Sequence, residues 1–199
     1  MSNNRPMSLR FPIALVLSIS CLTTSVWADF ETGMDAYQRG SYATALSEWR
    51  PLAEGGDAQA QLHLGLLYAN GEGVPQDYAK ARQYYEKAAA QGSASGQNNL
   101  GYLYADGKGV PKDEIKGAEW IRKAAEQRDA NGQASLGEMY RDGRGVPQDD
   151  VQALMWYNLG AANGAKHGAA LRDALAKQMT PDQLAKAQHL AQEWKPNAK

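Results

Sequence analysis

The chain has 199 residues, which is the length of one ordinary domain. It carries 21 basic and 22 acidic residues, and its formal net charge is −1. Because no stripe of lysines and arginines stands out, this balance argues against a nucleic-acid partner. A single cysteine excludes a fold held together by disulfide bonds within the chain.

The first 28 residues have the pattern of a secretory signal peptide. Arg5 and Arg10 form a positive start, an apolar run covers residues 11–22, and a short polar stretch leads to Ala28. This order is typical of a segment that directs export and is then removed. The apolar run is shorter than the about 20 residues that span a bilayer. We therefore expect cleavage after Ala28 and an exported chain, either periplasmic or secreted.

Other interpretations of this segment compete with cleavage after Ala28. Cys21 is a possible lipid attachment site, but the leucine usual three positions upstream is replaced by Ser18. An uncleaved membrane anchor is less favoured than lipid attachment. Met7 is an alternative initiator methionine, because a chain that starts there still has a positive region before the apolar run. Because no second long apolar stretch follows, we expect no transmembrane span in the mature chain.

Residues 29–57 resemble, in shortened form, the repeated units that follow them. Ala45, Trp49 and Ala53 recur at the helical spacing of four. A first helix is expected over residues 30–38, without a Gly-Val-Pro loop behind it. A divergent unit of this kind is expected at the end of a stack, where one face has no neighbour.

Three units of 36 residues come next, over 58–92, 93–128 and 129–164. Each contains a Leu-Gly pair and, nine residues later, a Gly-Val-Pro triplet. Self-similarity at this period marks a repeat architecture, in which each unit buries its apolar face against its neighbours. The recurring residues are Leu64-Gly65, Leu100-Gly101 and Leu136-Gly137, followed by the triplets at 73–75, 109–111 and 145–147.

Each unit is predicted to contain two helices joined by a short loop. Glycines that can adopt the left-handed conformation end the first helix, and aspartates that can cap free amides begin the second. These residues are Gly71, Gly107 and Gly143, then Asp77, Asp113 and Asp149.

Residues 165–199 are predicted to cap the C-terminal end of the stack. The segment from Gly164 to Ala176 begins like another first helix, but it lacks the Leu-Gly pair. Thr180 followed by Pro181 is a helix start. The amphipathic helix that follows, as far as Trp194, is expected to cover the last unit.

The repeated pattern Ala-x-x-x-Leu-Gly-x-x-Tyr-x-x-Gly-x-Gly-Val-Pro-x-Asp resembles the Sel1-like repeat, a relative of the tetratricopeptide repeat. The resemblance covers residues 30–164, with departures at Gly96, Gly132 and Arg128. It implies an all-α, right-handed superhelical solenoid of antiparallel helix pairs. It also implies an adaptor that binds a protein or peptide partner, and the layout resembles that of small exported bacterial proteins of this family.

By analogy with tetratricopeptide repeats, the first helices line a concave face. The residue type varies between units at the positions two residues before and two residues after the Leu, and at the helix ends. The packing positions, by contrast, repeat. The surface changes from apolar through aromatic to charged, which suits an extended peptide or a helix with one apolar and one polar end. The alternative is that these side chains are merely solvated or half-buried. The candidate binding residues are Leu62, Leu66, Asn70, Asn98, Tyr102, Asp106, Glu138, Arg141 and Asp142, and Ala134 occupies the matching position in the third unit.

Catalysis and metal binding find little support in the sequence. The three histidines are far apart, and no zinc or nucleophile motif is present. His63 is expected on a helix surface. A calcium loop after Asp106 would need oxygen ligands where Lys108 and Val110 stand. We expect neither a cofactor nor a metal site.

Three functions remain in competition at this stage. The leading hypothesis is an exported protein-binding scaffold that is not an enzyme. The second is an enzyme of the cell wall or one that interacts with β-lactams. Interaction with β-lactams is linked to a subgroup of the family whose units are cysteine-rich and stapled by disulfides, and this chain does not match that subgroup. The third is a structural subunit that docks through its end units. Oligomeric state and partner identity stay open.

Overall fold

The computed structural model describes residues 30–196. The predicted signal peptide, its cleavage site and Cys21 lie outside the described residues. Within residues 30–196 all regular secondary structure is helical and no strand occurs, so the predicted all-α solenoid of helix pairs is confirmed. A helix over residues 30–38 is followed by α2 (Tyr42–Glu54), α3 (Ala58–Asn70), α4 (Tyr78–Ala90), α5 (Ala94–Asp106), α6 (Glu114–Glu126), α7 (Ala130–Asp142), α8 (Asp150–Ala162), α9 (Lys166–Ala176) and α10 (Pro181–Glu193).

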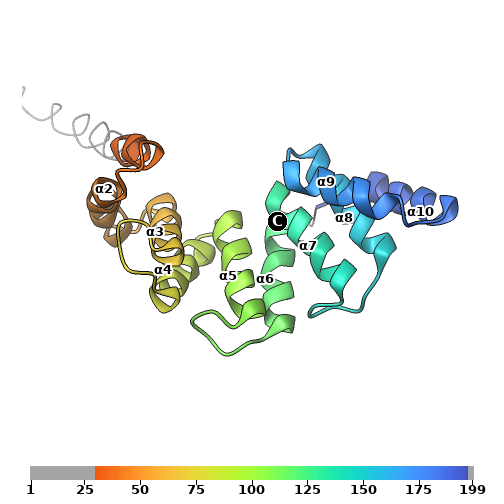
Figure 1. Ribbon diagram of the computed structural model, residues 1–199, viewed down its shortest axis with the longest axis horizontal. Coiled ribbons are helices and arrows are strands. Elements are labelled where there is room, and N and C mark those ends of the chain that lie inside the picture. Colours follow the sequence, from red (N-terminus) through yellow and green to blue (C-terminus); the bar gives the residue numbers. More distant parts are fainter. Residues whose placement is uncertain (1–29, 197–199) are drawn as a thin grey trace, which may run out of the picture.

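The helix pairs stack side by side into a curved rod (Figure 1). We call α3, α5, α7 and α9 the inner row and α4, α6 and α8 the outer row. Within the inner row, α5 contacts α7 and α7 contacts α9, whereas α3 and α5 have no comparable contact. Over residues 30–196, α4, α6 and α8 have no comparable contact with one another. The inner row therefore lies on the shorter side of the curve.

The predicted helix boundaries are confirmed. The three inner-row helices of the repeats end at glycines in the left-handed conformation, with φ of 73°, 70° and 67° at Gly71, Gly107 and Gly143. The outer-row helices start at aspartates whose carboxylates accept hydrogen bonds from backbone N–H groups in the first turn. Thr180 caps α10 in a reciprocal pair of hydrogen bonds with Gln183, and Pro181 occupies the first turn.

The Leu-Gly pair holds the two helices of a unit together. The leucine is fully buried, as at Leu100, which is 1% exposed. The glycine leaves room for the outer-row helix, because a Cβ at Gly101 would lie 2.8 Å from the Gly117 carbonyl oxygen and 2.5 Å from Ile121 Cγ1. At Gly65 and Gly137 the same space is filled by the rings of Tyr85 and Tyr157.

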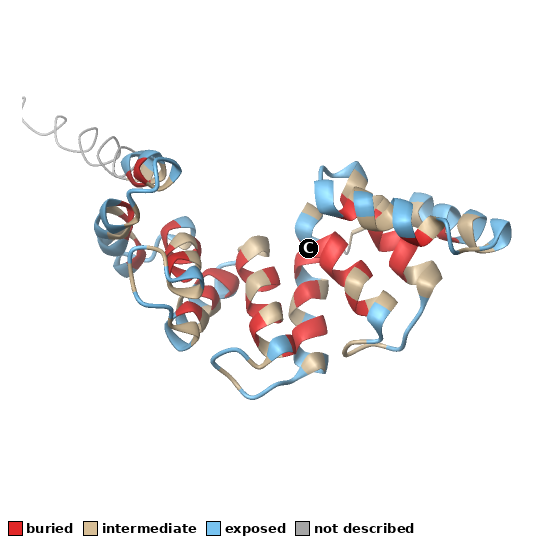
Figure 2. Cartoon of the chain, in the orientation of Figure 1, coloured by how far each residue is buried: buried red, intermediate tan, exposed pale blue. Residues whose placement is uncertain are grey.

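The apolar core is a row of clusters along the rod, as Figure 2 shows by the buried segments in every helix pair. Trp49 and Leu64 belong to one cluster, which links the short first unit to the next. Tyr85 and Leu100 belong to the second, which again crosses a unit boundary. Burial between units therefore adds to the burial within each unit in supplying the hydrophobic stabilisation.

A buried ladder of glutamines also crosses every unit boundary. The amide nitrogen of each inner-row glutamine donates to a carbonyl oxygen near the end of the preceding helix, at 3.0, 3.4 and 3.3 Å. Its amide oxygen accepts a hydrogen bond of 2.8 Å from the residue that ends the following outer-row helix. The three rungs are Ala53–Gln61–Gln91, Ala89–Gln97–Gln127 and Ala125–Gln133–Asn163.

This glutamine ladder is a feature that the sequence analysis missed. The glutamines of the inner row are 4%, 7% and 0% exposed, which is unusual for a polar side chain. Burial is tolerated because both ends of each amide are hydrogen-bonded. Glutamine recurring at 61, 97 and 133 was a visible signal. The period places Ala169 at the next position, so the ladder stops where the C-terminal cap begins.

The C-terminal helices cover the last repeat. Helix α9 packs on α7 and α8, and α10 packs on α8. The Trp194 ring meets the Trp156 ring at a centroid distance of 5.6 Å. The Arg128 guanidinium lies 5.9 Å from the Trp194 ring centre. Arg128 has a φ of 64°, at a turn where the other units have glycine, a conformation that costs an L side chain about 1 kcal/mol.

His63 is not the surface residue that the sequence suggested. Its ring packs 4.7 Å from the Trp49 ring, and the rings of Phe30 and Tyr37 surround it at 5.6 and 6.4 Å. These aromatic side chains come from the short first unit, whose packing on α3 the spacing alone does not reveal. Burial lowers the pKa of His63, which outweighs the opposite influence of Asp57.

The first prediction concerns the glutamine ladder. Gln97→Leu keeps the side-chain volume but removes two hydrogen bonds, so we expect the free energy of unfolding to fall by about 1–3 kcal/mol. Urea unfolding followed by circular dichroism measures this change. The control is Gln83→Leu, an exposed position of α4, where we expect a change within about 0.5 kcal/mol. Equal stability of Gln97→Leu and the parent chain would contradict a structural role for the ladder.

The second prediction concerns pH. Because the folded chain lowers the pKa of His63, the unfolded chain binds a proton there more readily, and stability at this residue is lost as pH falls below about 6.5. His63→Phe removes this contribution. We expect the parent chain to lose more stability than the variant between about pH 7 and about pH 5, measured by urea unfolding at both values. The other histidines are present in both chains. Equal losses would show that His63 titrates alike in the folded and unfolded chains.

Candidate functional site

The predicted binding residues lie on the inner row, but they do not share one environment. Leu62 and Asn98 are only 8% and 7% exposed, and Ala134 is 4% exposed. Leu62 belongs to the same cluster as Leu100 of the next unit. The position two residues before the Leu therefore packs between units, and these three side chains lack the accessible surface that a binding role needs.

The position two residues after the Leu is different, because it reaches the surface in all three units. Leu66, Tyr102 and Glu138 are all half-buried. They belong to successive inner-row helices α3, α5 and α7, and they differ in chemistry from one unit to the next. We call these three residues the inner-row triplet. Asn70, at the end of α3, is exposed.

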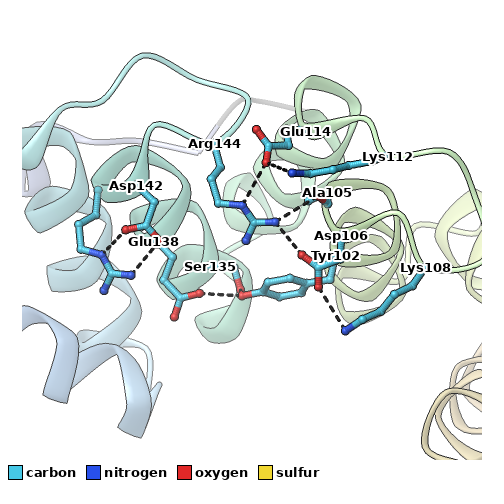
Figure 3. Close-up of polar contacts among 11 residues, drawn as sticks. Tyr102, Ala105, Asp106, Lys108, Lys112, Glu114, Ser135, Glu138, Asp142 and Arg144 are labelled. Atoms are coloured by element: carbon cyan, nitrogen blue, oxygen red, sulfur yellow. Dashed lines mark hydrogen bonds and ion pairs between the residues drawn. The ribbon is translucent and has the colours of Figure 1, made fainter.

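Glu138 connects three inner-row helices. The Tyr102 hydroxyl of α5 donates to Glu138 Oε2 at 3.0 Å and lies 2.9 Å from Ser135 Oγ of α7 (Figure 3). Glu138 Oε1 lies 3.0 Å from His167 Nε2 of α9. Burial raises the pKa of Tyr102 to about 12, so its hydroxyl keeps its proton and acts as a donor.

Asp106 already has partners in the neighbouring unit. Arg144 donates to Asp106 Oδ1 at 2.6 Å and also lies 3.6 Å from Glu114 Oε1, and Lys108 lies 3.3 Å from Asp106 Oδ2 (Figure 3). Burial raises the pKa of Asp106, but hydrogen bonds from Arg144 and Lys108 outweigh it and lower the pKa overall. Asp106 therefore joins units, rather than standing free for a ligand as its place at a helix end suggested.

The residue before the glycine of each Gly-Val-Pro triplet reaches one unit back. The pKa of Tyr37 in the first unit is raised by burial and then by the charge and hydrogen bond of Glu72. Lys108 stands over the Tyr78 ring at 5.7 Å, and Arg144 forms the ion pairs above. The residue type changes each time, so the sequence pattern gave no sign of this shared contact.

Arg141 and Asp142 neutralise each other at the end of α7. The guanidinium donates to both carboxylate oxygens, at 2.7 and 2.9 Å. This contact lowers the pKa of Asp142. Of the three carboxylates predicted to bind a partner, Asp106 and Asp142 are thus paired with cations, whereas Glu138 contacts a phenol and an imidazole in the described part of the chain.

A second concave feature lies at the C-terminal end, and the sequence analysis did not foresee it. A hollow of about 430 Å³ opens between α8, α9 and α10. Leu154, Leu159 and Leu184 line it, with polar groups of Asn158 and Arg172 beside them.

Two further properties concern metals and membranes. Within residues 30–196 no group of three histidine, cysteine, aspartate or glutamate side chains is placed to hold a metal ion. None of the described helices combines the length and the apolar character that crossing a membrane requires.

Comparisons with known structures support the fold. A Sel1 repeat protein from Oxalobacter formigenes matches with 30% identity and a TM-score of 0.68, over 83% of this chain and 68% of that one. The protective antigen c5321 of uropathogenic Escherichia coli has 32% identity and a TM-score of 0.59 over 87% of this chain, which spans 46% of that protein. Cysteine-rich protein B of Helicobacter pylori has 25% identity and a TM-score of 0.52, over 65% of this chain and 96% of that one. No curated protein matches the sequence.

The family comparison agrees with the repeats found in the sequence. The Sel1 repeat model matches residues 58–93, 94–129 and 130–164, which together make up more than half of the chain. These three segments contain the pairs α3–α4, α5–α6 and α7–α8, whose stacking carries the glutamine ladder. The chain therefore belongs to the Sel1 repeat family.

Proposed function

We propose that this chain is an exported scaffold that binds a segment of a partner protein along the inner row. The observation that carries the proposal is the inner-row triplet. Leu66, Tyr102 and Glu138 occupy equivalent, accessible positions of three successive helices, yet their chemistry differs. The Leu-Gly pairs and the glutamine ladder of the same helices recur with the period. An accessible position whose chemistry changes from unit to unit, on helices whose packing positions repeat, suits a recognition surface.

The family supports the general type of function. Sel1 repeat proteins are typically non-catalytic scaffolds for protein interaction. A row of parallel helices offers side chains along a line, which suits a partner segment that runs across the helices. Leu66 supplies an apolar contact, Tyr102 an amphipathic one and Glu138 a charged one. Export is supported by the pattern of residues 1–28 alone.

A second candidate is docking through the C-terminal end of the stack. The hollow between α8, α9 and α10, with Leu154 and Leu184 in its wall, favours this possibility. In this case the protein would be a subunit of an envelope assembly, and the inner row would serve only to connect units. The two candidates use surfaces far enough apart in sequence to be tested separately.

The third prediction separates these two surfaces. A photo-crosslinking amino acid is placed at position 66 or 102 of the inner row, at position 188 in the hollow, and at the exposed positions 83 and 119 of the outer row. Each chain is expressed in full and irradiated in intact cells, and adducts are identified by mass spectrometry. We expect one protein partner from positions 66 and 102 and none from 83 and 119, because the proposed partner segment lies on the inner row and the outer row faces away from it.

Two outcomes would contradict binding on the inner row. Adducts from position 188 alone would favour docking through the C-terminal hollow. Equal adducts from all five positions would show contact without a preferred face. Thermal unfolding of each modified chain provides the control that the stack is intact.

A further inference from the structure

We propose that the partner segment presents a lysine or arginine side chain to Glu138. This inference rests on the proposed binding along the inner row and adds the chemistry of the partner. It is carried by the contacts of a single carboxylate, which differ from those of the other predicted carboxylates on this face. The occupant is a cationic side chain of a protein segment, not a metal ion or a small anion.

Glu138 is half-buried and negatively charged without a lysine or arginine partner among residues 30–196. Its side chain is 23% exposed. The two arginines nearest in sequence form their ion pairs elsewhere, Arg144 with Asp106 and Glu114, and Arg141 with Asp142. The hydrogen bond with Asp142 is the main cause of the raised pKa of Arg141, although the charge of Glu138 also contributes to it. Taking a carboxylate partly out of water is costly unless it is hydrogen-bonded or paired. A cation from outside the chain would supply the missing pair.

The two oxygens of Glu138 have different roles. Oε2 accepts the hydrogen bond of Tyr102, a residue held between α5 and α7, so this oxygen is fixed. Oε1 faces His167, whose side chain is 73% exposed and can turn toward solvent. A partner ammonium or guanidinium that displaces the imidazole therefore reaches Oε1 without disturbing a buried contact. The carboxylate would then make a charge-assisted hydrogen bond, which is stronger than a neutral one.

The inner-row triplet also sets a spacing for the partner. Leu66 and Glu138 occupy equivalent positions two units apart. Packed helices lie about 10 Å apart. Because α5 and α7 are in contact and α3 and α5 have no comparable contact, the two side chains are separated by at least about 20 Å along the row. An extended chain advances about 3.3 Å per residue. The expected segment thus has an apolar residue and a basic residue at least about six positions apart, with room for Tyr102 to contact the residues between them.

The experiment selects peptides on the full chain and then measures their affinity. A library of random 12-residue peptides displayed on phage is selected on the purified protein and counter-selected on Leu66→Asp. Affinities of the selected peptides are measured by fluorescence anisotropy for the parent chain, Glu138→Gln and Glu119→Gln. Glutamine at 138 can still accept from Tyr102, and Glu119 is an exposed outer-row carboxylate that serves as the matched control. Thermal unfolding confirms that each variant is folded.

We expect the selected peptides to be rich in lysine or arginine at one position. Their dissociation constants should rise about tenfold for Glu138→Gln, as for loss of a half-buried ion pair, and stay unchanged for Glu119→Gln. Affinity for the parent chain should fall as salt is added. Selection on Glu138→Lys should instead yield peptides with aspartate or glutamate at that position.

Two results would overturn the inference, and they differ in what they mean for the proposed function. Peptides that need Leu66 but bind Glu138→Gln as tightly as the parent chain would remove the role of Glu138 and leave the inner-row function standing. If no selected peptide distinguishes the parent chain from Leu66→Asp, binding along the inner row fails as well.

Discussion

Close contact between helices of neighbouring units is the constraint on which the rest of the structure depends. Each unit alone has two helices and cannot enclose its own core. Small residues such as Gly132 bring helix backbones of neighbouring units together, because a Cβ on this residue of α7 would lie 3.0 Å from the backbone of Ala124 in α6. Close approach also buries the ends of the outer-row helices. Their carbonyl oxygens then need a hydrogen bond from within the protein, which the glutamine ladder provides.

Local features of the fold could be predicted from the sequence because they depend on nearby residues. A glycine such as Gly107 ends its helix by its own freedom to adopt positive φ, and an aspartate such as Asp113 caps a helix that starts at the next residue. The Leu-Gly pair predicted the face of the helix that is buried. These signals repeat at a fixed period, so three units agree on each one.

The candidate site could be predicted only in part, because it depends on contacts between units. Leu62 and Asn98 lie two residues before the leucine of the Leu-Gly pair, where a residue of the binding groove is expected. The structure buries both side chains instead. His63 could not be placed without the aromatic side chains of the short first unit. Asp106 pairs with Arg144, but that position is occupied by glutamate or lysine in the other units, so no repeating pattern marks the contact. Glu138 and Tyr102 were predicted individually, while their hydrogen bond was not.

The proposed function assigns stability and recognition to different positions of the same helices. On α7, Gln133 and Leu136 are buried against neighbouring helices, whereas Glu138 is half-buried and contacts Tyr102 and His167 at the accessible edge of the row. Each ladder glutamine joins its unit to the preceding one and also binds the end of the outer-row helix in its own unit. Under the proposed function, a change in the ladder therefore affects the stack, whereas a change in the inner-row triplet affects chiefly the partner.

Hydrogen exchange of side-chain amides tests the stacking of units most directly. Nuclear magnetic resonance can follow the Nε2 protons of Gln61, Gln97 and Gln133 against those of the exposed Gln83. Buried, hydrogen-bonded amides exchange with water only when the structure opens. The three ladder glutamines should exchange much more slowly than Gln83. If all four exchange at the same rate, the units are not packed as described, and the division between stacking and recognition positions fails with them.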